Sequence, residues 1–193
     1  MSSAFALPAP LVLADLIPRS LARTTSLVVG GAVLTGLCAQ VAFFLPGTPV
    51  PVTLQTFSVL LVGAALGWRL AATSLGLYLA AGLAGVPWFS GQTSGWTTAT
   101  SGYLVGFIVA AVLVGMLSSR GGDRTPLRTL VTMSLGTVTI YLFGAAGLAF
   151  SLDLGLGDAI RTGVAPFLLG DALKILAAAG LLPLAWRSLG HRS

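Results

Sequence analysis

The chain has 193 residues, of which 55% are hydrophobic and only 8% are charged, and its mean hydropathy is +0.96. Soluble domains carry about a quarter charged residues, so this composition excludes a soluble enzyme and indicates an integral membrane protein. The net charge of +5 does not indicate nucleic-acid binding, because the basic residues stand singly between apolar runs and form no basic patch.

Six apolar runs approach or reach the length needed to cross a bilayer. In chain order they cover residues 25–45, 52–67, 70–85, 101–119, 128–150 and 163–186. The second and third are short, so we expect them to cross with little tilt, to form a tight hairpin or to be partly re-entrant. The sequence therefore predicts an all-α integral membrane protein of six transmembrane helices. It forms one domain over 1–193, with an interfacial segment at 1–24, a bundle at 25–186 and a tail at 187–193.

The arginines predict the orientation of this bundle. With six spans, one side holds Arg19, Arg23, Arg69, Arg120, Arg124, Arg128, Arg187 and Arg192. The loops of the other side hold only Arg161, together with Asp153 and Asp158. Because cytoplasmic loops are enriched in Lys and Arg, we expect both termini to be cytoplasmic and the chain to lie in the cytoplasmic membrane. Residues 15–23 are expected to form a short helix in the membrane interface, with a disordered terminus as the alternative.

Two charged residues, Asp171 and Lys174, fall inside the sixth predicted span, and Lys174 is the only lysine of the sequence. Their spacing of three places them on one face of a helix. If that helix begins near Gly163, Asp171 lies about 12 Å deep and Lys174 near the midplane. Buried ions are costly, so they face an interior or a cavity. We interpret them as groups that recognise a buried solute. A packing or register pair and a proton or ion relay are the alternatives.

An aromatic and polar segment, residues 86–100, precedes the fourth predicted span. It carries Trp88, Phe89 and Trp96 interleaved with Gln92 and Thr93, and Tyr103 follows closely. An interfacial aromatic belt is one interpretation. We favour a lid over a ligand, because glycines and polar side chains between the rings suit a pocket better than a belt.

Four motifs in order resemble the BioY family, the biotin-specific substrate-capture (S) components of energy-coupling-factor (ECF) transporters. They are residues 50–57 (VPVTLQTF), 85–87 with the 91–95 loop, 100–107 (TSGYLVGF) and 170–174 (GDALK). The resemblance covers most of the chain. It departs from the family at Leu169, where the family usually has Pro, at Ala99–Thr100, and in a shorter loop without the usual Asn, whose role Gln92 or Thr93 would take over.

The resemblance implies biotin capture and uptake. It assigns substrate binding to Asp171, Lys174, Gln92, Thr93, Trp88, Phe89, Trp96, Tyr103 and Gln55. The implied partners are biotin, a transmembrane coupling subunit and two ATPase subunits of an ECF-type transporter. The sequence contains no phosphate-binding loop, so we expect no ATP hydrolysis by this chain itself. We also expect no catalytic residue, cofactor or metal.

Ala32 and Gly36 form a small-xxx-small pattern in the first predicted span. We expect it to let a partner helix approach closely, and packing within this protein is the alternative. Other functions remain open at this point: capture of a different vitamin, or a structural membrane protein without a ligand. Catalysis is disfavoured, because His191 lies near the end of the sequence and only one carboxylate, Asp171, is predicted to be well buried.

Overall fold

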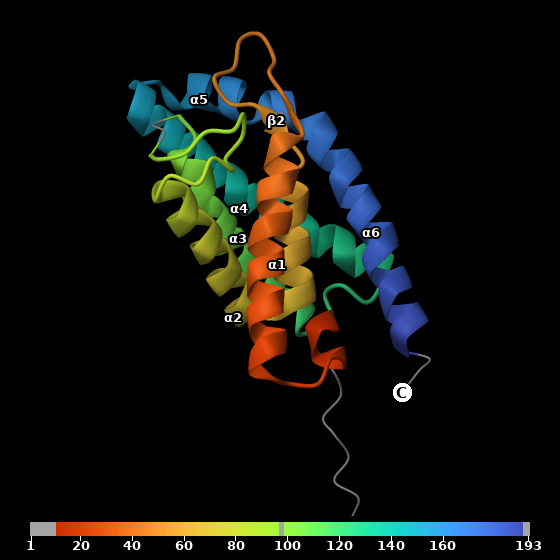
Figure 1. Cartoon of the computed structure of the whole chain (residues 1–193). Helices are drawn as coiled ribbons and strands as arrows, with labels where there is room; N and C mark the ends of the chain where they lie inside the picture. Colours follow the sequence, from red (N-terminus) through yellow and green to blue (C-terminus); the bar gives the residue numbers. More distant parts are fainter. Residues whose placement is uncertain (1–10, 97–98, 191–193) are drawn as a thin grey trace, which may run out of the picture.

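A computed structural model describes residues 11–96 and 99–190 and shows a predominantly helical chain (Figure 1). Its long helices are α1 (Leu21–Gln40), α2 (Gln55–Leu83), α3 (Ser101–Ser118), α4 (Pro126–Leu152) and α6 (Leu168–Gly190). The shorter elements are η1 (Leu13–Leu16), β1 (Ala42–Phe43), β2 (Val52–Thr53), α5 (Leu156–Gly163) and η2 (Ala165–Phe167). Five helical segments are long and apolar enough to cross a membrane, so this is a multi-pass membrane protein.

Helix α2 is broken at Gly67. The backbone there has φ 75° and ψ 167°, a conformation that is essentially confined to glycine. Gln55 Nε2 donates a hydrogen bond of 2.9 Å to the hydroxyl of Tyr78. In a straight helix, 23 residues would separate these side chains by about 35 Å. The two arms of α2, residues 55–66 and 68–83, therefore fold back on each other as a hairpin, one of the three arrangements expected for the short second and third spans.

Local capping sets several helix bounds. The Ser20 hydroxyl accepts a hydrogen bond from the Arg23 amide at 3.0 Å and starts α1, and Thr125 with Pro126 starts α4.

The expected start of the sixth span at Gly163 is wrong. Gly163 ends α5, and Pro166, which lacks an amide proton, lies in η2, so α6 begins at Leu168. Asp171 is therefore in the first turn of α6, not about 12 Å along the helix.

The core lies where α2, α3 and α4 meet. Its largest fully buried side chains include Val59, Leu75, Tyr78, Val114, Met133, Ile140 and Leu148. Helices α3 and α4 approach closely at a pair of glycines. A Cβ atom added to Gly147 would lie 2.6 Å from the Cα of Gly102, so this crossing excludes any larger residue. The close contact brings the start of α3 against the end of α4, beside the functional site.

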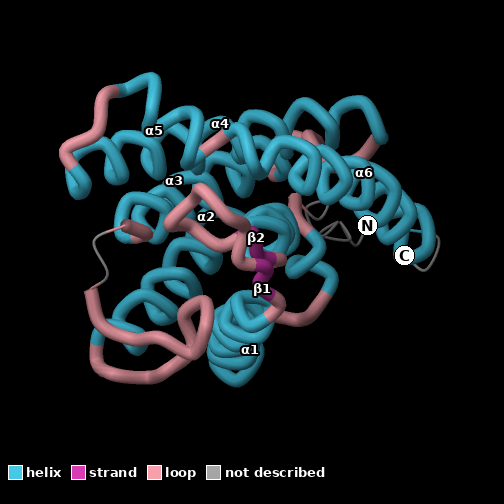
Figure 2. Tube along the Cα trace, turned by 90° about the horizontal axis from the view of Figure 1, so that it is seen from above, coloured by secondary structure: helices cyan, strands magenta, loops and turns pink. Residues whose placement is uncertain are grey.

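Irregular segments cover one end of the bundle. Strands β1 and β2 pair antiparallel, with Ala42 opposite Thr53, and Figure 2 shows them among the helix ends, beside α1. The loop that joins α2 to α3 and the short helix α5 lie at this same end, and Figure 1 shows α5 crossing it. The Tyr103 hydroxyl donates to the Gly163 carbonyl at 2.5 Å and ties α3 to the end of α5. We call this end the capped end.

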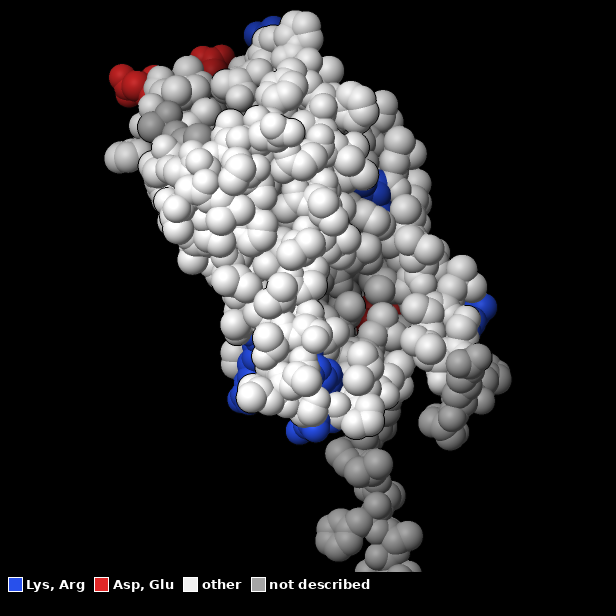
Figure 3. Space-filling view, viewed as in Figure 1, with Lys and Arg blue, Asp and Glu red and all other residues white. Residues whose placement is uncertain are grey.

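Charged atoms lie mainly at the two ends of the molecule on the face shown in Figure 3. At the end opposite the capped end, the N-terminal segment packs on the bundle. Val12 and Ala14 are buried there, Val12 contacts the turn at Gly67, and the Arg23 guanidinium donates to the Ala14 carbonyl. Of the segment expected to lie in the membrane interface, residues 13–16 form η1 and residues 21–23 begin α1, and its position relative to a membrane stays a prediction. Residues 1–10 lie outside the described chain.

Candidate ligand-binding site

A cavity of about 250 Å³ opens beneath the capped end. Segments far apart in the sequence form its wall: the β1–β2 connection, β2, the α2–α3 loop with the two helices that flank it, α4, η2 and α6. The lining residues are Phe44, Pro49, Val50, Pro51, Thr53, Gln55, Thr56, Phe89, Ser90, Thr93, Ala99, Thr100, Tyr103, Leu104, Phe107, Ile140, Tyr141, Phe167, Asp171 and Lys174. Most of the lining surface is apolar and polar groups interrupt it, which is typical of small-molecule sites.

Asp171 and Lys174 lie in this wall as a tight ion pair. Lys174 Nζ lies 2.7 Å from Asp171 Oδ1, and Asp171 is 4% exposed. The ammonium also donates to the Thr53 carbonyl at 2.6 Å and to the Thr56 hydroxyl at 2.9 Å. Its three protons therefore have three protein partners. A buried ion pair with such partners avoids the cost of an uncompensated charge.

Hydroxyl groups of two further helices reach the Asp171 carboxylate. Thr56 Oγ1 of α2 donates to Asp171 Oδ1 at 3.0 Å, and the Tyr141 hydroxyl of α4 donates to Oδ2 at 2.6 Å. Each carboxylate oxygen has about two acceptor sites. Oδ1 accepts from Lys174 and Thr56, whereas Oδ2 accepts only from Tyr141 among these bonds and keeps capacity for another donor.

Six of the nine residues expected at the substrate site lie around the cavity: Asp171, Lys174, Gln55, Phe89, Thr93 and Tyr103. Gln55 and Tyr103 use polar atoms within the protein, through the bonds to Tyr78 and Gly163. Phe89 packs with its ring edge against Tyr78, the ring centroids 5.3 Å apart. These three side chains therefore present mainly a rigid wall, because the protein itself holds their positions.

The other three residues, Trp88, Gln92 and Trp96, do not line the cavity. Trp88 donates from its indole to the Tyr78 carbonyl at 3.0 Å and supports the loop from behind. Gln92 is exposed, and its backbone N–H donates to the Gln40 side-chain oxygen at 3.3 Å. Trp96 is 60% exposed. The structure thus divides the expected aromatic lid: Phe89 faces the cavity, and the two tryptophans do not.

Ala32 and Gly36 lie inside the chain. Ala32 is 1% exposed, and a Cβ atom on Gly36 would lie 3.2 Å from the Trp88 ring. At Gly36 the close approach is thus made by this protein's own Trp88. These contacts favour the packing alternative, and a partner-helix interface at the two positions stays a prediction.

Three contributors to the site were not anticipated: Thr56, Tyr141 and the Thr53 carbonyl. Thr56 follows Gln55 in the motif already noted, and Tyr141 is the one hydroxyl-bearing aromatic residue within α4, so each offered a signal. A backbone carbonyl offers none. Together with the ion pair, these groups place hydrogen-bond donors and acceptors in a cavity that aromatic side chains also line.

Comparison with known proteins places this chain among known relatives. The sequence model of the BioY family matches residues 10–191. The "Probable biotin transporter BioY" of Pyrococcus horikoshii is 34% identical over 160 residues, which cover 81% of this chain and 92% of that protein. The "Biotin transporter BioY" of Rhizobium etli is 35% identical over 141 residues, 68% of this chain and 75% of that protein.

A solved structure shares the fold. The crystal structure of the S-component for biotin from an ECF-type ABC transporter superposes with a TM-score of 0.79 and covers 88% of this chain and 95% of that chain. At 19% sequence identity, this likeness describes the fold only.

Proposed function

This chain belongs to the BioY family, and from that premise we propose that it captures biotin for uptake across the cytoplasmic membrane. The observation that carries the proposal is the buried Asp171–Lys174 pair in the wall of a largely apolar cavity. Family membership also supports a transport role rather than catalysis.

The chemistry of biotin fits the two sides of this cavity. Its head group is a neutral cyclic urea with two N–H donors and one carbonyl acceptor. The paired side chains are neutral in sum, so they suit this head group better than an additional buried anion. The thioether ring and aliphatic chain would contact apolar side chains such as Phe89, Tyr103 and Phe107. The carboxylate, which is costly to desolvate, would stay toward the loops, where Ser90, Thr93 and Thr100 line the cavity.

Hydrogen-bond capacity sharpens this assignment. Asp171 Oδ2 retains acceptor capacity beside Tyr141, so a urea N–H would bind there without displacing a protein group. The three protons of Lys174 already have protein partners. A urea carbonyl would therefore share or replace one of these bonds. We expect the N–H to Asp171 bond to contribute more net affinity than the bond from Lys174.

Equilibrium binding of labelled biotin to the detergent-purified chain tests the proposal. Asp171→Asn and Lys174→Met are expected to weaken binding by about ten- to a hundredfold, because a hydrogen bond to a charged group contributes about 1.5–3 kcal/mol. Thermal unfolding of each variant gives the folded fraction, since breaking a buried pair also lowers stability.

Helix α5 offers matched controls. Asp158 and Arg161 have the same spacing of three but lie exposed at the capped end, so Asp158→Asn and Arg161→Met should bind like the unmodified chain. Wild-type affinity in both Asp171→Asn and Lys174→Met would refute the assigned site. No saturable binding by the unmodified chain would refute biotin capture itself.

We further propose six crossings, with both termini in the cytoplasm, and assembly with an ECF coupling subunit and two ATPase subunits. The Gly67 hairpin supports the count, because each arm of α2 would cross separately. The segregation of arginines to the end opposite the capped end supports the orientation. The chain contains no phosphate-binding loop, so energy for uptake would come from the ATPase subunits.

A further inference from the structure

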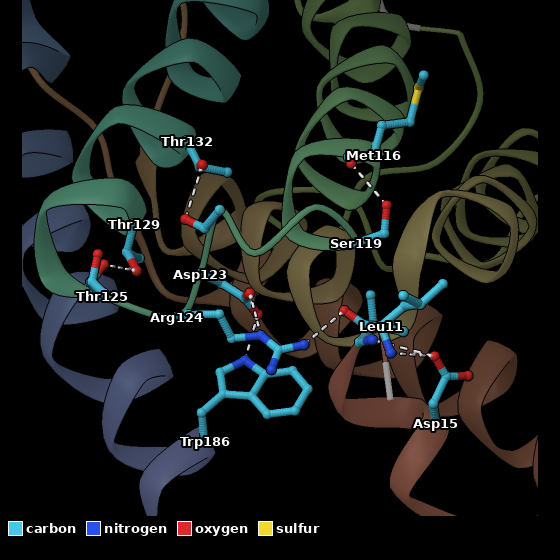
Figure 4. Close-up of polar contacts among 12 residues, drawn as sticks. Leu11, Asp15, Met116, Ser119, Asp123, Arg124, Thr125, Thr129, Thr132 and Trp186 are labelled. Atoms are coloured by element: carbon cyan, nitrogen blue, oxygen red, sulfur yellow. Dashed lines mark hydrogen bonds and ion pairs between the residues drawn. The ribbon is translucent and has the colours of Figure 1, made fainter. Parts of the chain in front are cut away.

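A second polar cluster holds α6 at the end opposite the cavity (Figure 4). The indole of Trp186 donates a hydrogen bond of 2.8 Å to Asp123 Oδ2. The Arg124 guanidinium lies over the face of the same ring, with Cζ 3.4 Å from the centroid, and its Nε is 3.6 Å from Asp123 Oδ1. We name Asp123, Arg124 and Trp186 the α6 clamp. It holds the indole both at its edge and over its face, so it restricts rotation as well as translation.

The clamp connects α6 to two other parts of the chain. Asp123 and Arg124 belong to the turn between α3 and α4, and Arg124 also donates to the Leu11 carbonyl at 3.2 Å. The amides of Leu11 and Val12 in turn donate to Asp15, and Val12 contacts the turn at Gly67. The lower end of α6 is therefore fixed to the same framework that carries both arms of α2 and the start of α4.

Burial makes this arrangement costly to maintain. Asp123 has no exposed surface, and burial raises the pKa of its carboxyl above the ordinary value, against the opposing effects of the Trp186 hydrogen bond and the Arg124 charge. An apolar contact of the same size would avoid this desolvation cost. The polar cluster instead fixes the orientation of the Trp186 indole, because a hydrogen bond and a stacked guanidinium define one orientation of the ring.

Asp171 and Trp186 lie on one buried stripe of α6. The stripe also contains Ala178, Ala179 and Leu182, and its ends are about 22 Å apart at 1.5 Å per residue. The other side of α6 exposes leucines: Leu169, Leu173, Leu176, Leu181 and Leu184. A small void of about 10 Å³ adjoins Ile175 and Ala178. Between its two polar ends, α6 is thus held by small apolar contacts.

Such contacts resist rotation weakly. Apolar packing has no preferred direction, and in a bilayer there is no hydrophobic force pressing one helix onto another. The orientation of α6 therefore depends on its polar ends, one at Asp171 and Lys174 and the other at the α6 clamp. When a ligand replaces or shares bonds at the first end, the second end alone keeps the helix in place.

We propose that Asp123, Arg124 and Trp186 are positioning residues for ligand binding, acting through α6 on Asp171 and Lys174 from the opposite end of the molecule. This inference rests on the proposed function, because it concerns how the biotin-binding groups are held. The clamp keeps Asp171 Oδ2 and Lys174 Nζ directed into the cavity, and its loss allows α6 to turn and lowers affinity without touching the ligand.

Two variants break the same hydrogen bond from opposite sides. Trp186→Phe removes the donor and keeps a ring for Arg124, and Asp123→Ala removes the acceptor. Each is expected to weaken biotin binding by the folded detergent-purified chain about tenfold, and the double variant should be no weaker than the more affected single variant. Asp123→Asn keeps an acceptor oxygen for the Trp186 indole, so its biotin affinity should stay close to that of the unmodified chain.

Trp68 provides a matched control. It lies at the same end of the molecule with Arg69 over its ring at 4.9 Å, but it belongs to α2. Trp68→Phe should leave biotin affinity unchanged. Thermal unfolding corrects each measurement for the folded fraction. If folded Trp186→Phe and Asp123→Ala bind biotin as Trp68→Phe does, the clamp has only a structural role and the inference is overturned.

The unmodified chain gives an independent test that needs no folded variant. Coupling between two ends of one helix is reciprocal, so biotin must stabilise the clamp as the clamp stabilises the site. Hydrogen–deuterium exchange of amides 184–190 should slow when biotin is bound. Unchanged exchange there, in a chain that binds biotin, overturns the inference but leaves the proposed function intact. A chain that binds no biotin fails the proposed function instead.

Discussion

The Thr56 hydroxyl is the smallest group in the site and the one that joins both ions. It donates to Asp171 Oδ1 at 3.0 Å and accepts from Lys174 Nζ at 2.9 Å. Because Thr56 belongs to α2 and both ions belong to α6, this single side chain fixes the spacing between the two helices at the polar side of the cavity. Its loss would leave an acceptor and a donor underbonded in a buried place.

Thr56→Val should therefore weaken biotin binding by about tenfold and lower the free energy of unfolding by about 1–3 kcal/mol, the cost of leaving buried polar groups unsatisfied. Binding of labelled biotin and thermal unfolding in detergent measure the two effects. The matched control is Thr139→Val, because the Thr139 hydroxyl is exposed and only bonds the Leu135 carbonyl of its own helix. Equal behaviour of the two variants would contradict this account of Thr56.

The charged residues of the site could be predicted from the sequence, whereas the hydroxyl groups that bond them could not. Asp171 and Lys174 stood out because an ion within an apolar run has few structural explanations. Thr56 and Thr139 look alike in sequence, since a helical threonine can always bond its own backbone, and only the fold shows which one meets an ion. The composition of the 86–100 segment predicts that Trp88 and Trp96 belong to a lid. The same composition fits a tryptophan that bonds a nearby carbonyl, as Trp88 does, or one that is exposed, as Trp96 is.

Among the helices, α2 determines how two walls of the cavity are placed. Its reversal at Gly67 places Gln55 beside Tyr78, and Tyr78 beside the loop that carries Phe89. One glycine in a conformation closed to other residues therefore aligns two walls of the cavity. A Cβ atom at Gly67 would meet only Val12 at 3.4 Å, an ordinary contact, so a substitution there isolates the backbone cost from steric overlap.

Gly67→Ala is expected to lower the free energy of unfolding by about 1–3 kcal/mol, because the alanine must adopt a strained backbone. Gly76→Ala is the control, since Gly76 lies within a helical arm with open space beside it, and alanine favours helix there. Thermal unfolding of both variants in the same detergent compares them. A stabilised Gly67→Ala variant would show that the turn tolerates a different backbone.

Most elements were predictable, and the exceptions share a cause. The expected run 101–119 agrees with α3 within one residue, because it is uniformly apolar between polar loops. Helix α5 and the later start of α6 were missed. An eight-residue helix that contains glycine has little helical signal of its own, and its stability comes from tertiary contacts such as the Tyr103 bond to Gly163.

The whole molecule has two chemically different ends. Asp153, Asp158 and Arg161 lie at the capped end, whereas the turns beside Gly67 and Asp123 carry Arg69, Arg120, Arg124 and Arg128. This asymmetry, with the family resemblance, was fully present in the sequence. The way in which the helices enclose a cavity was not, because that depends on close crossings such as Gly102 with Gly147 that composition does not specify.

Cysteine labelling tests the orientation of the ends. In a Cys38→Ser background, Leu156→Cys places a thiol on α5, where Leu156 is 67% exposed, and Arg120→Cys places one at the opposite end. A membrane-impermeant maleimide should label the first variant in intact cells and the second only after permeabilisation. The Cys38→Ser chain alone serves as the blank. The reverse pattern would place the cavity toward the cytoplasm.

The position of Lys174 has a practical consequence. The sequence holds no other lysine, and this one lies with a side chain only 14% exposed in the wall of the cavity. Amine-directed acylating reagents, used widely to immobilise or fluorescently tag proteins, therefore find a single ε-amino group, already held by three oxygen atoms. Among side-chain amines, such chemistry either modifies none or reports directly on the place where the cargo would sit.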